Sequence, residues 1–307
     1  MSLVRKSLIS LSNWSLKEVE SLFYQSSNFK SKPYQISQKS KGKLVSFAFF
    51  EPSTRTKLSF QTALARLGLS SSDLGTLSDS SMSKGESFSE TLKTIEAMQP
   101  DLMILRANTT AGEQNSINEY SLPIINAGCG SIGHPTQALT DVFTISEKLE
   151  VNNLKILFVG DINHSRVVKS NIKLLKKFAG VSFGFCGPSG FLPKLGEYES
   201  SHLFSSLEEA LAWCNVCMGL RVQKERHTKE GFSTSEYQKN YRLTAEKMNK
   251  YLNKNAFIMH PGPHVPEMDF DPLIFNDPRC LVRSQVSNGV YIRMALIASI
   301  LGLQEGK

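Results

Sequence analysis

The chain has 307 residues, of which 40% are hydrophobic and 21% are charged, and its formal net charge at pH 7 is +7. This balance is typical of a soluble globular protein, and the length predicts two domains rather than one hydrophobic core. The apolar runs are shorter than the roughly 18–20 residues of a transmembrane helix. Residues 1–6 lead into a polar stretch rather than a signal peptide, so we expect a cytoplasmic protein with no membrane partner.

The predicted elements of the first half are strands and helices in alternation. A capping box at residues 15–18 starts the first helix, and Gly68 ends the helix that carries Phe60 and Leu64 on one face. The other expected elements are strands at 43–51, 102–105 and 122–126, helices at 87–98 and 135–149, and loops at 27–42 and 75–88.

The second half repeats this alternation. Residues 224–245 are charged and weakly periodic, which predicts a long loop of the kind that is usually functional or disordered. The remaining elements are expected as strands at 154–159, 181–186, 217–220 and 257–259, and as helices at 165–178, 207–213 and 290–301. Such alternation predicts an α/β protein of two domains, each an open parallel sheet flanked by helices.

The basic residues are spread along the chain rather than gathered in one segment with aromatic residues between them. A nucleic-acid-binding protein would be expected to concentrate them, so we predict no nucleic-acid partner. Two interpretations remain open: a solvated surface, or a positive field that attracts anionic metabolites.

Five cysteines occur at scattered positions, which predicts a reducing compartment and no disulfide framework. Cys214 and Cys217 form a CxxC pattern. A redox site would need the start of a thioredoxin-like helix, and a zinc site would need a second ligand pair. We therefore interpret them as small apolar residues where a helix passes into a buried strand, and we expect neither a metal nor a cofactor.

The strongest local motif is Pro52-Ser53-Thr54-Arg55-Thr56, which follows a predicted strand and opens a helix. Backbone N–H groups at a helix N-terminus attract anions, and three hydroxyls with one guanidinium suit the oxygens of a phosphate. An ordinary N-cap would need only one such hydroxyl. The motif therefore predicts a phosphate site.

Residues 128–133 (GCGSIG) match the dinucleotide-binding pattern G-x-G-x-x-G after a strand and before a helix. A dinucleotide site also requires an acidic residue about 20 positions later, at the end of the next strand. That strand ends near Asp161, which is too far along the chain. We interpret these glycines as close-packing turn residues beside a small ligand, which disfavours a nicotinamide-dependent dehydrogenase.

Further polar side chains are expected at the carboxyl ends of predicted strands, where ligands bind in such sheets. His134 could donate a hydrogen bond to a carbonyl and Gln137 could bind an amide, although His134 alone would more commonly be a helix cap. Arg106 follows a strand and could equally be a solvated arginine.

Arg166 and Arg221, with Gln223, would suit a dicarboxylate because each arginine can form a bidentate pair. Ser80 and Lys84 lie in a polar loop, and their composition alone predicts solvated side chains.

Together these residues resemble the catalytic chains of aspartate carbamoyltransferases, in the aspartate/ornithine carbamoyltransferase superfamily. The resemblance covers nearly the whole chain in order, through the segments 50–56 (FEPSTRT), 84–86 (KGE), 134–137 (HPTQ), 160–166, 221–226 (RVQKER) and 260–263 (HPGP). The first and third segments are shared with ornithine carbamoyltransferases. The lysine loop and RVQKER indicate aspartate, and an ornithine enzyme would be expected to carry a cysteine in the last segment.

The resemblance implies a cofactor-free transfer of the carbamoyl group from carbamoyl phosphate to L-aspartate, an early step of pyrimidine biosynthesis. The implied catalytic residues are Arg55, Thr56, Lys84, Arg106 and His134. The implied ligands of carbamoyl phosphate are Ser53, Thr54, Arg55, Thr56, Arg106, His134, Gln137 and the carbonyls of Pro261 and Gly262. Aspartate would be bound by Lys84, Arg166, Arg221 and Gln223.

The resemblance also implies an organisation. Residues 1–149 with the C-terminal helix 288–307 would bind carbamoyl phosphate, residues 150–287 would bind aspartate, and the active site would lie in the cleft between them. Ser80 and Lys84 would come from a neighbouring subunit of a homotrimer. Whether a regulatory chain or a dihydroorotase associates is left open, as are cooperativity and any assembly beyond a trimer.

Three residues depart from the family pattern: Cys129 replaces a usual aspartate, Ala107 a common histidine and His264 a common arginine. Two other functions stay open at this point. One is a carbamoyltransferase that acts on a different amine, and the other is an inactive anion-binding assembly subunit of the same fold.

Overall fold

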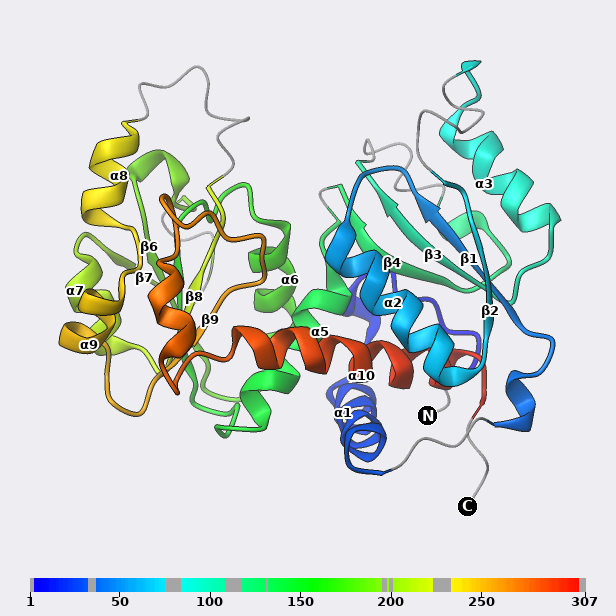
Figure 1. The fold of residues 1–307 in the computed structure, drawn as a ribbon, viewed down its shortest axis with the longest axis horizontal. Helices are drawn as coiled ribbons and strands as arrows, with labels where there is room; N and C mark the ends of the chain where they lie inside the picture. Colours follow the sequence, from blue (N-terminus) through cyan, green and yellow to red (C-terminus); the bar gives the residue numbers. More distant parts are fainter. Residues whose placement is uncertain are drawn as a thin grey trace. The chain divides into compact units, whose positions relative to one another are not determined.

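The computed structural model describes residues 3–32, 37–75, 84–108, 117–130, 132–194, 198, 201–222 and 233–303. The chain divides into two compact units (Figure 1). Unit 1 comprises residues 1–143 and 286–307, and unit 2 comprises residues 144–285. Both boundaries fall inside helices, α5 (Pro135–Ser146) and α10 (Val282–Ile300). The two units are therefore joined by continuous helical chain.

Unit 1 is built on a four-stranded parallel sheet in the order β2-β1-β3-β4. Its strands are β1 (Leu44–Phe49), β2 (Ser70–Asp73), β3 (Leu102–Ala107) and β4 (Ile124–Cys129). Its helices, besides the parts of α5 and α10 that it includes, are α1 (Leu16–Ser31), α2 (Thr54–Leu67), α3 (Phe88–Ala97) and the 3₁₀ turns η1 (Leu11–Asn13), η2 (Gln38–Ser40) and η5 (Ile117–Glu119). Both faces of β3 are buried, as parallel strands between helices require.

Unit 2 is built on a five-stranded parallel sheet in the order β7-β6-β5-β8-β9. Its strands are β5 (Lys155–Val159), β6 (Ser182–Cys186), β7 (Ser201–Phe204), β8 (Val216–Gly219) and β9 (Phe257–Met259). Its helices are α6 (Arg166–Leu175), α7 (Leu207–Trp213), α8 (Thr234–Asn240), α9 (Ala245–Tyr251) and the 3₁₀ turns η6 (Ser189–Phe191) and η8 (Pro272–Asn276). The prediction of two parallel sheets flanked by helices is confirmed.

Local sequence accounts for most of the helix starts. Ser15 and Glu18 form the predicted capping box, in which each side chain bonds to the other residue's backbone N–H. Helix α1 continues to Ser31, so the loop predicted over 27–42 is wrong for its first residues. Serine is usually disfavoured inside a helix. Here the buried hydroxyl of Ser26 donates a hydrogen bond to the carbonyl of Leu22, one turn earlier in α1.

Two of the four edge strands, β2 and β7, were not predicted. The residues of β2, Ser70–Asp73, are all exposed, so the strand has no apolar alternation for a sequence pattern to detect. It is held by backbone pairing with β1 and by a 2.7 Å hydrogen bond between the hydroxyls of Ser46 and Ser72. The long loop predicted at 224–245 is wrong from Ser233 onward, where that residue caps α8 and Tyr237 is buried.

The CxxC cysteines lie where they were expected. Cys214 ends α7 and Cys217 lies within β8, and both side chains are fully buried. Burial raises the pKa of Cys214 to about 12 and that of Cys217 well above its usual value. Both thiols are therefore protonated at neutral pH and act as packing residues.

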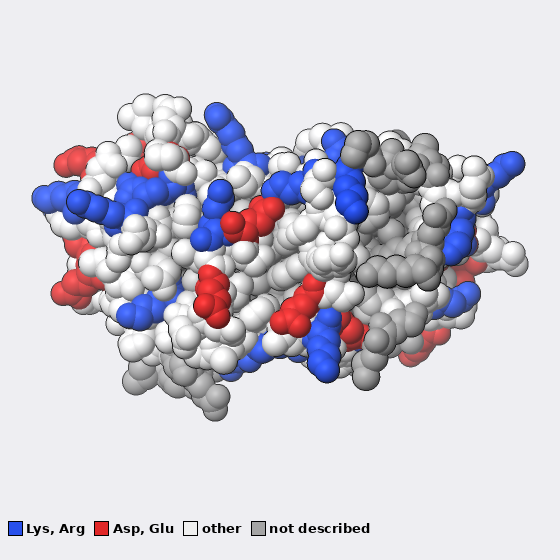
Figure 2. All heavy atoms as spheres, turned by 90° about the horizontal axis from the view of Figure 1, so that it is seen from below, with Lys and Arg blue, Asp and Glu red and all other residues white. Residues whose placement is uncertain are grey.

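The described helices include none that is both long and apolar enough to cross a membrane. On the face of the molecule drawn in Figure 2, basic and acidic side chains are interspersed.

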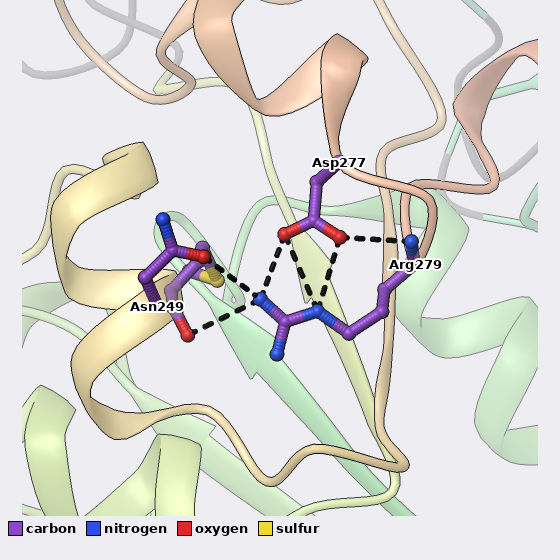
Figure 3. Close-up of polar contacts among 4 residues, drawn as sticks. Asn249, Asp277 and Arg279 are labelled. Carbon is purple, nitrogen blue, oxygen red and sulfur yellow. Dashed lines mark hydrogen bonds and ion pairs between the residues drawn. The ribbon is translucent and has the colours of Figure 1, made fainter.

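A local ionic network lies beside the last strand of unit 2 (Figure 3). The guanidinium of Arg279 bonds to Asp277 at 2.7 Å and 3.0 Å, and to the side-chain oxygen of Asn249 at 3.3 Å. Asp277 also accepts the backbone N–H of Arg279 at 2.8 Å. These hydrogen bonds to Arg279 are the main reason that the pKa of Asp277 is lowered.

We expect Asp277→Asn to lower the free energy of unfolding by about 1–2 kcal/mol at pH 7, because a charge-assisted network loses its anion. A carboxyl group with a lowered pKa in the folded state stabilises above its unfolded pKa and loses that contribution as pH falls through the folded pKa. The difference from wild type should therefore shrink below about pH 4 in thermal unfolding curves. Lys93→Gln, which breaks a pair whose side chains are 61% and 60% exposed, should change almost nothing. An equal loss of unfolding free energy in Asp277→Asn and Lys93→Gln would contradict the stabilising role of the Asp277 network.

Candidate active site

The predicted ligand-binding residues lie at the point of each sheet where the strand order reverses. In unit 1, β2 and β3 lie on opposite sides of β1. In unit 2, β6 and β8 lie on opposite sides of β5. Open parallel sheets bind ligands outside the carboxyl ends of the strands at this point. The motif 52–56 follows β1, Arg106 lies near the end of β3, and Arg221 follows β8.

The start of helix α2 differs from the other serine-capped helices. The hydroxyl of Ser15, Ser87 or Ser165 accepts a backbone N–H of its helix, but that of Ser53 makes no such bond. Ser53 therefore keeps its hydroxyl for another partner, beside the N–H groups of a 14-residue helix. This is the arrangement expected of an anion site rather than of a simple cap.

Two further side chains complete the start of α2. Thr56 is buried, whereas Arg55 is exposed to solvent. Nearby atoms that exclude water lower the pKa of Arg55, which nevertheless stays far above neutrality. The helix start thus presents a fixed positive charge.

The alternative that Arg106 is a solvated surface arginine is excluded by its surroundings. Its side chain is only 12% exposed, and its guanidinium bonds to Glu51 at 2.8 Å and to the carbonyl of Ala127 at 3.0 Å. Glu51 follows β1 and Ala127 belongs to β4, so Arg106 is braced from both neighbouring strands. A guanidinium held in this way can direct its remaining N–H groups toward a ligand.

His134 directly precedes α5, and Gln137 lies on its first turn. The imidazole of His134 is buried, and its Nδ1 lies 3.3 Å from the hydroxyl of Thr136. Gln137 donates from Nε2 to Asp141 at 2.8 Å. Before this helix, Gly128, Gly130 and Gly133 all have positive φ, and Cys129 pairs with Gly133, which agrees with the interpretation as turn residues.

In unit 2, a small cluster surrounds the turn after β5. Gly160 has a φ of 120°, and a Cβ there would lie 2.9 Å from the carbonyl oxygen of Leu220 and 3.0 Å from the hydroxyl of Tyr237. Only glycine allows the turn and the β8 end to approach this closely. Asp161 next to it is fully buried, and its carboxylate lies 2.8 Å from the ring Nδ1 of His164 and accepts the backbone N–H of His164 at 3.4 Å.

Arg221 lies near a buried carboxyl group that the sequence analysis missed. Burial raises the pKa of Asp269 to about 6, while backbone N–H groups and the charge of Arg221 oppose that shift. Asp269 accepts the N–H of Val265 at 2.6 Å and lies 4.0 Å from Nε2 of His260. Arg166, the first residue of α6, is half-buried.

The segment after β9 carries Pro261 and Gly262, both half-buried. His260 accepts the N–H of Gly262 at its Nδ1, at 2.9 Å, and its own N–H bonds to Gln285 at 3.0 Å. The family resemblance implies that the carbonyls of Pro261 and Gly262 bind carbamoyl phosphate. The segment that carries them is thus anchored by a buried histidine.

Not every predicted residue can be placed. Ser80 and Gln223 lie outside the described residues, and Lys84 is exposed at the start of a described segment. The described groups that come together in unit 1 are at the ends of β1, β3 and β4, and those in unit 2 are at the ends of β5, β8 and β9. In the described part of the chain, no group of three or more His, Cys, Asp or Glu side chains could hold a metal ion.

The three departures from the family pattern occupy packed positions. The thiol of Cys129 donates to the carbonyl of Leu105, and Ala107 is buried. The ring of His264 packs edge-on against Phe270 and Phe275, with centroids 6.1 Å and 5.0 Å away. All three therefore make contacts within their own unit.

The fold is that of a two-domain α/β enzyme, and two family models that together cover most of the chain show that it belongs to the aspartate/ornithine carbamoyltransferase family. The family model "Aspartate/ornithine carbamoyltransferase, carbamoyl-P binding domain" matches residues 6–147, and "Aspartate/ornithine carbamoyltransferase, Asp/Orn binding domain" matches residues 152–300.

Among its relatives, the aspartate carbamoyltransferase catalytic subunit of Helicobacter pylori is 37% identical over 304 residues, covering 96% of this chain and 97% of the relative. That of Desulfitobacterium hafniense is 40% identical over 265 residues, covering 85% and 84%. The structure is similar to that of aspartate transcarbamoylase from Trypanosoma cruzi with N-(phosphonacetyl)-L-aspartic acid, with a TM-score of 0.87, 26% identity and coverage of 97% and 96%.

The uncommitted hydroxyl of Ser53 gives a direct test of the anion site. Ser53→Ala should change the free energy of unfolding by less than about 0.5 kcal/mol, because no cap is lost. The same variant should weaken the binding of inorganic phosphate by roughly threefold to tenfold.

Ser87→Ala is the matched control, since Ser87 caps α3 with a 3.2 Å bond from the N–H of Glu90. It should lower the free energy of unfolding by about 1 kcal/mol and leave phosphate binding unchanged. Thermal unfolding and titration calorimetry measure the two quantities, and a stability loss in Ser53→Ala equal to that of Ser87→Ala would refute the assignment.

Proposed function

We propose that this chain is an aspartate carbamoyltransferase, which transfers the carbamoyl group of carbamoyl phosphate to the amine of L-aspartate. The products are N-carbamoyl-L-aspartate and phosphate, and the reaction is an early step of pyrimidine biosynthesis. The observation that carries the proposal is the match of both family domains over nearly the whole chain, together with relatives that are named for this activity. The polar groups at the ends of both sheets support it.

Unit 1 is proposed to bind carbamoyl phosphate. Its phosphate would be held by Ser53, Thr54, Arg55 and Thr56, at a helix start whose N–H groups and positive charge suit a dianion. Binding there requires no rearrangement of the cap, because Ser53 does not bond to its own helix.

The carbamoyl carbonyl is proposed to bind against Thr56, Arg106 and His134. When the aspartate amine attacks the carbonyl carbon, negative charge develops on its oxygen, and donors already fixed in place stabilise that charge best. Arg106 is fixed by its bonds to Glu51 and Ala127. The carbamoyl amino group would be bound by Gln137 and the carbonyls of Pro261 and Gly262.

The chemistry balances without a cofactor or a covalent enzyme intermediate. The amine nitrogen forms a bond to the carbamoyl carbon, the bond from that carbon to the phosphate oxygen breaks, and the departing phosphate takes the amine proton. Positioning of the two substrates supplies the proximity gain.

Unit 2 is proposed to bind aspartate through Arg166, Arg221 and Gln223, and Lys84 would also contact it. Each carboxylate of the substrate matches the planar fork of a guanidinium. The nearby Asp269 would hold Arg221 in place by charge attraction.

The proposed organisation follows the family resemblance. The chain would be a cytoplasmic homotrimer whose active sites are shared, with Ser80 and Lys84 supplied by the neighbouring subunit. The carbamoyl-phosphate-binding domain would span residues 1–149 with 288–307, and the aspartate-binding domain 150–287.

The purified chain should form N-carbamoyl-L-aspartate from carbamoyl phosphate and aspartate, and should prefer aspartate when a panel of amines that includes ornithine is offered. His134→Ala should lower kcat by roughly 100- to 1,000-fold because it removes a donor at the developing charge, and Lys84→Ala should lower it by a similar factor because it removes a cation that positions the aspartate. Lys93→Ala, an exposed lysine on α3, is the control and should keep full activity.

Two results would redirect the proposal. Faster turnover with another amine would identify a different carbamoyltransferase. Phosphate binding without turnover of any amine would favour an inactive anion-binding subunit.

Shared active sites predict complementation between inactive variants. Trimers assembled at random from equal amounts of Lys84→Ala and His134→Ala chains should recover roughly a quarter of wild-type activity, because about one interface in four pairs an intact Lys84 with an intact His134. The two variants are refolded together, and activity is measured against each variant refolded alone. If each site belonged to a single chain, the mixture would stay as inactive as its parents.

A further inference from the structure

Two buried side chains of opposite charge, Asp141 and Arg293, interact electrostatically in unit 1, and the catalytic steps above leave them without a role. Asp141 lies one turn after Gln137 on α5 and is fully buried, and Arg293 on α10 is 4% exposed. Burying charges is unfavourable unless they are paired, and apolar residues of similar size would usually be at least as stable. The pair therefore requires an explanation beyond packing.

Arg293 is held in place from three helices. Its guanidinium lies over the ring of Phe60 on α2 at 4.9 Å, and its NH1 donates to the carbonyl of Gly289 on α10 at 2.8 Å. Gly289 leaves the space for it, because a Cβ there would lie 2.5 Å from that NH1 and 3.7 Å from Thr140 on α5. The position of this charge is thus fixed by the packing of α2, α5 and α10.

The charge of Arg293 acts on Asp141. Burial lowers the pKa of Arg293 to about 10, and the negative charge of Asp141 opposes that shift. Arg293 is therefore charged at neutral pH, and the two opposite charges partly offset each other's desolvation. Within the described part of the chain, Nε of Arg293 has no hydrogen-bond partner, which makes the pair unfavourable as a purely structural device.

The carboxylate in turn fixes the orientation of an amide. An ionised carboxylate only accepts hydrogen bonds, so the group of Gln137 that lies 2.8 Å from Asp141 must be its Nε2 donor. The carbonyl oxygen Oε1 then lies at the other end of the amide. An amino group only donates, so this orientation suits a ligand that bears –NH₂ and disfavours one that bears a methyl group or an acceptor.

We propose that Asp141, held by the buried Arg293, is a positioning residue that orients the amide of Gln137 so that Oε1 accepts a hydrogen bond from the amino group of the carbamoyl donor. This inference rests on the proposed function and deepens it. It explains how the site distinguishes a carbamoyl group from an acetyl group of nearly the same shape. Gln137 makes the contact, while Asp141 and Arg293 act through it.

The test compares two stable ligands with the full-length chain. Phosphonoacetamide carries the amide –NH₂, and acetonylphosphonate carries a methyl group in its place. Titration calorimetry should show that wild type binds the amide more tightly by roughly fivefold to tenfold, the range of one hydrogen bond. Asp141→Ala should bring that ratio close to one.

Asp141→Ala leaves Arg293 buried without its partner and could fail to fold, so a second variant is needed. Asp141→Leu with Arg293→Met replaces the pair by apolar residues of similar size and should keep the stability of wild type while losing the amide preference. Gln137→Leu should lose the preference too, and adding the double change to it should have no further effect. Glu18→Gln alters another buried acid of unit 1, paired with Lys6 at 2.6 Å, and should keep the preference.

The outcomes separate the two levels of the argument. An unchanged ratio in the Asp141 variants, or an equal weakening of both ligands, overturns the positioning role while the proposed function stands. A ratio near one in wild type does the same. If wild type binds neither phosphonate, the carbamoyl phosphate site itself is refuted, and the positioning role with it.

Discussion

The binding of two anions of like charge is the physical constraint on which the site depends. Carbamoyl phosphate and aspartate repel each other, so their reaction requires positive or donating groups that are in place before they bind. A parallel sheet supplies such groups where it ends, because each strand leads to a turn and the following helix presents its N–H groups. The residues that we propose as ligands lie in such places in both units: α2 follows β1, and Arg221 follows β8.

Two of the arginines that we assign to the site lie near a carboxylate of their own unit. Arg106 bonds to Glu51, and Arg221 interacts with Asp269. Asp141 and Arg293 form the same kind of pair one layer further from the ligand. A guanidinium that is bonded to a carboxylate of its own unit is fixed in direction. Orientation, rather than the number of charges, is therefore what the fold contributes.

Short-range patterns in the sequence predicted much of this arrangement. The capping box at Ser15, the buried run of β1 and the motif after it are all local, and residues 52–56 could be proposed as an anion site from their types alone. Strand β2 was missed because all four of its residues are polar, and β7 because its short sequence SHLF does not alternate apolar with polar residues. Tyr237 was missed because one buried aromatic residue is too weak a signal for a helix.

The groups that orient the site were also missed, for a different reason. Asp269 acts on Arg221, and Arg293 acts on Asp141, across distances along the chain that a single sequence does not relate. A lone buried acid and a lone helical arginine look like surface residues until the fold brings them together. Which charged residues pair with each other is decided by the tertiary structure, and local sequence propensity does not predict it.

Strand β2 has a consequence for self-association. It is one of the two outer strands of its sheet, and an exposed outer strand is a template on which a second chain can add hydrogen bonds. Here that template is only four residues long, its side chains are three serines and one aspartate, and Asp73 is engaged by Lys57 at 2.7 Å. A short, hydrophilic and charged edge strand offers an incoming strand little apolar surface to bury. This edge of the sheet is therefore protected against amyloid-like stacking while the chain is folded.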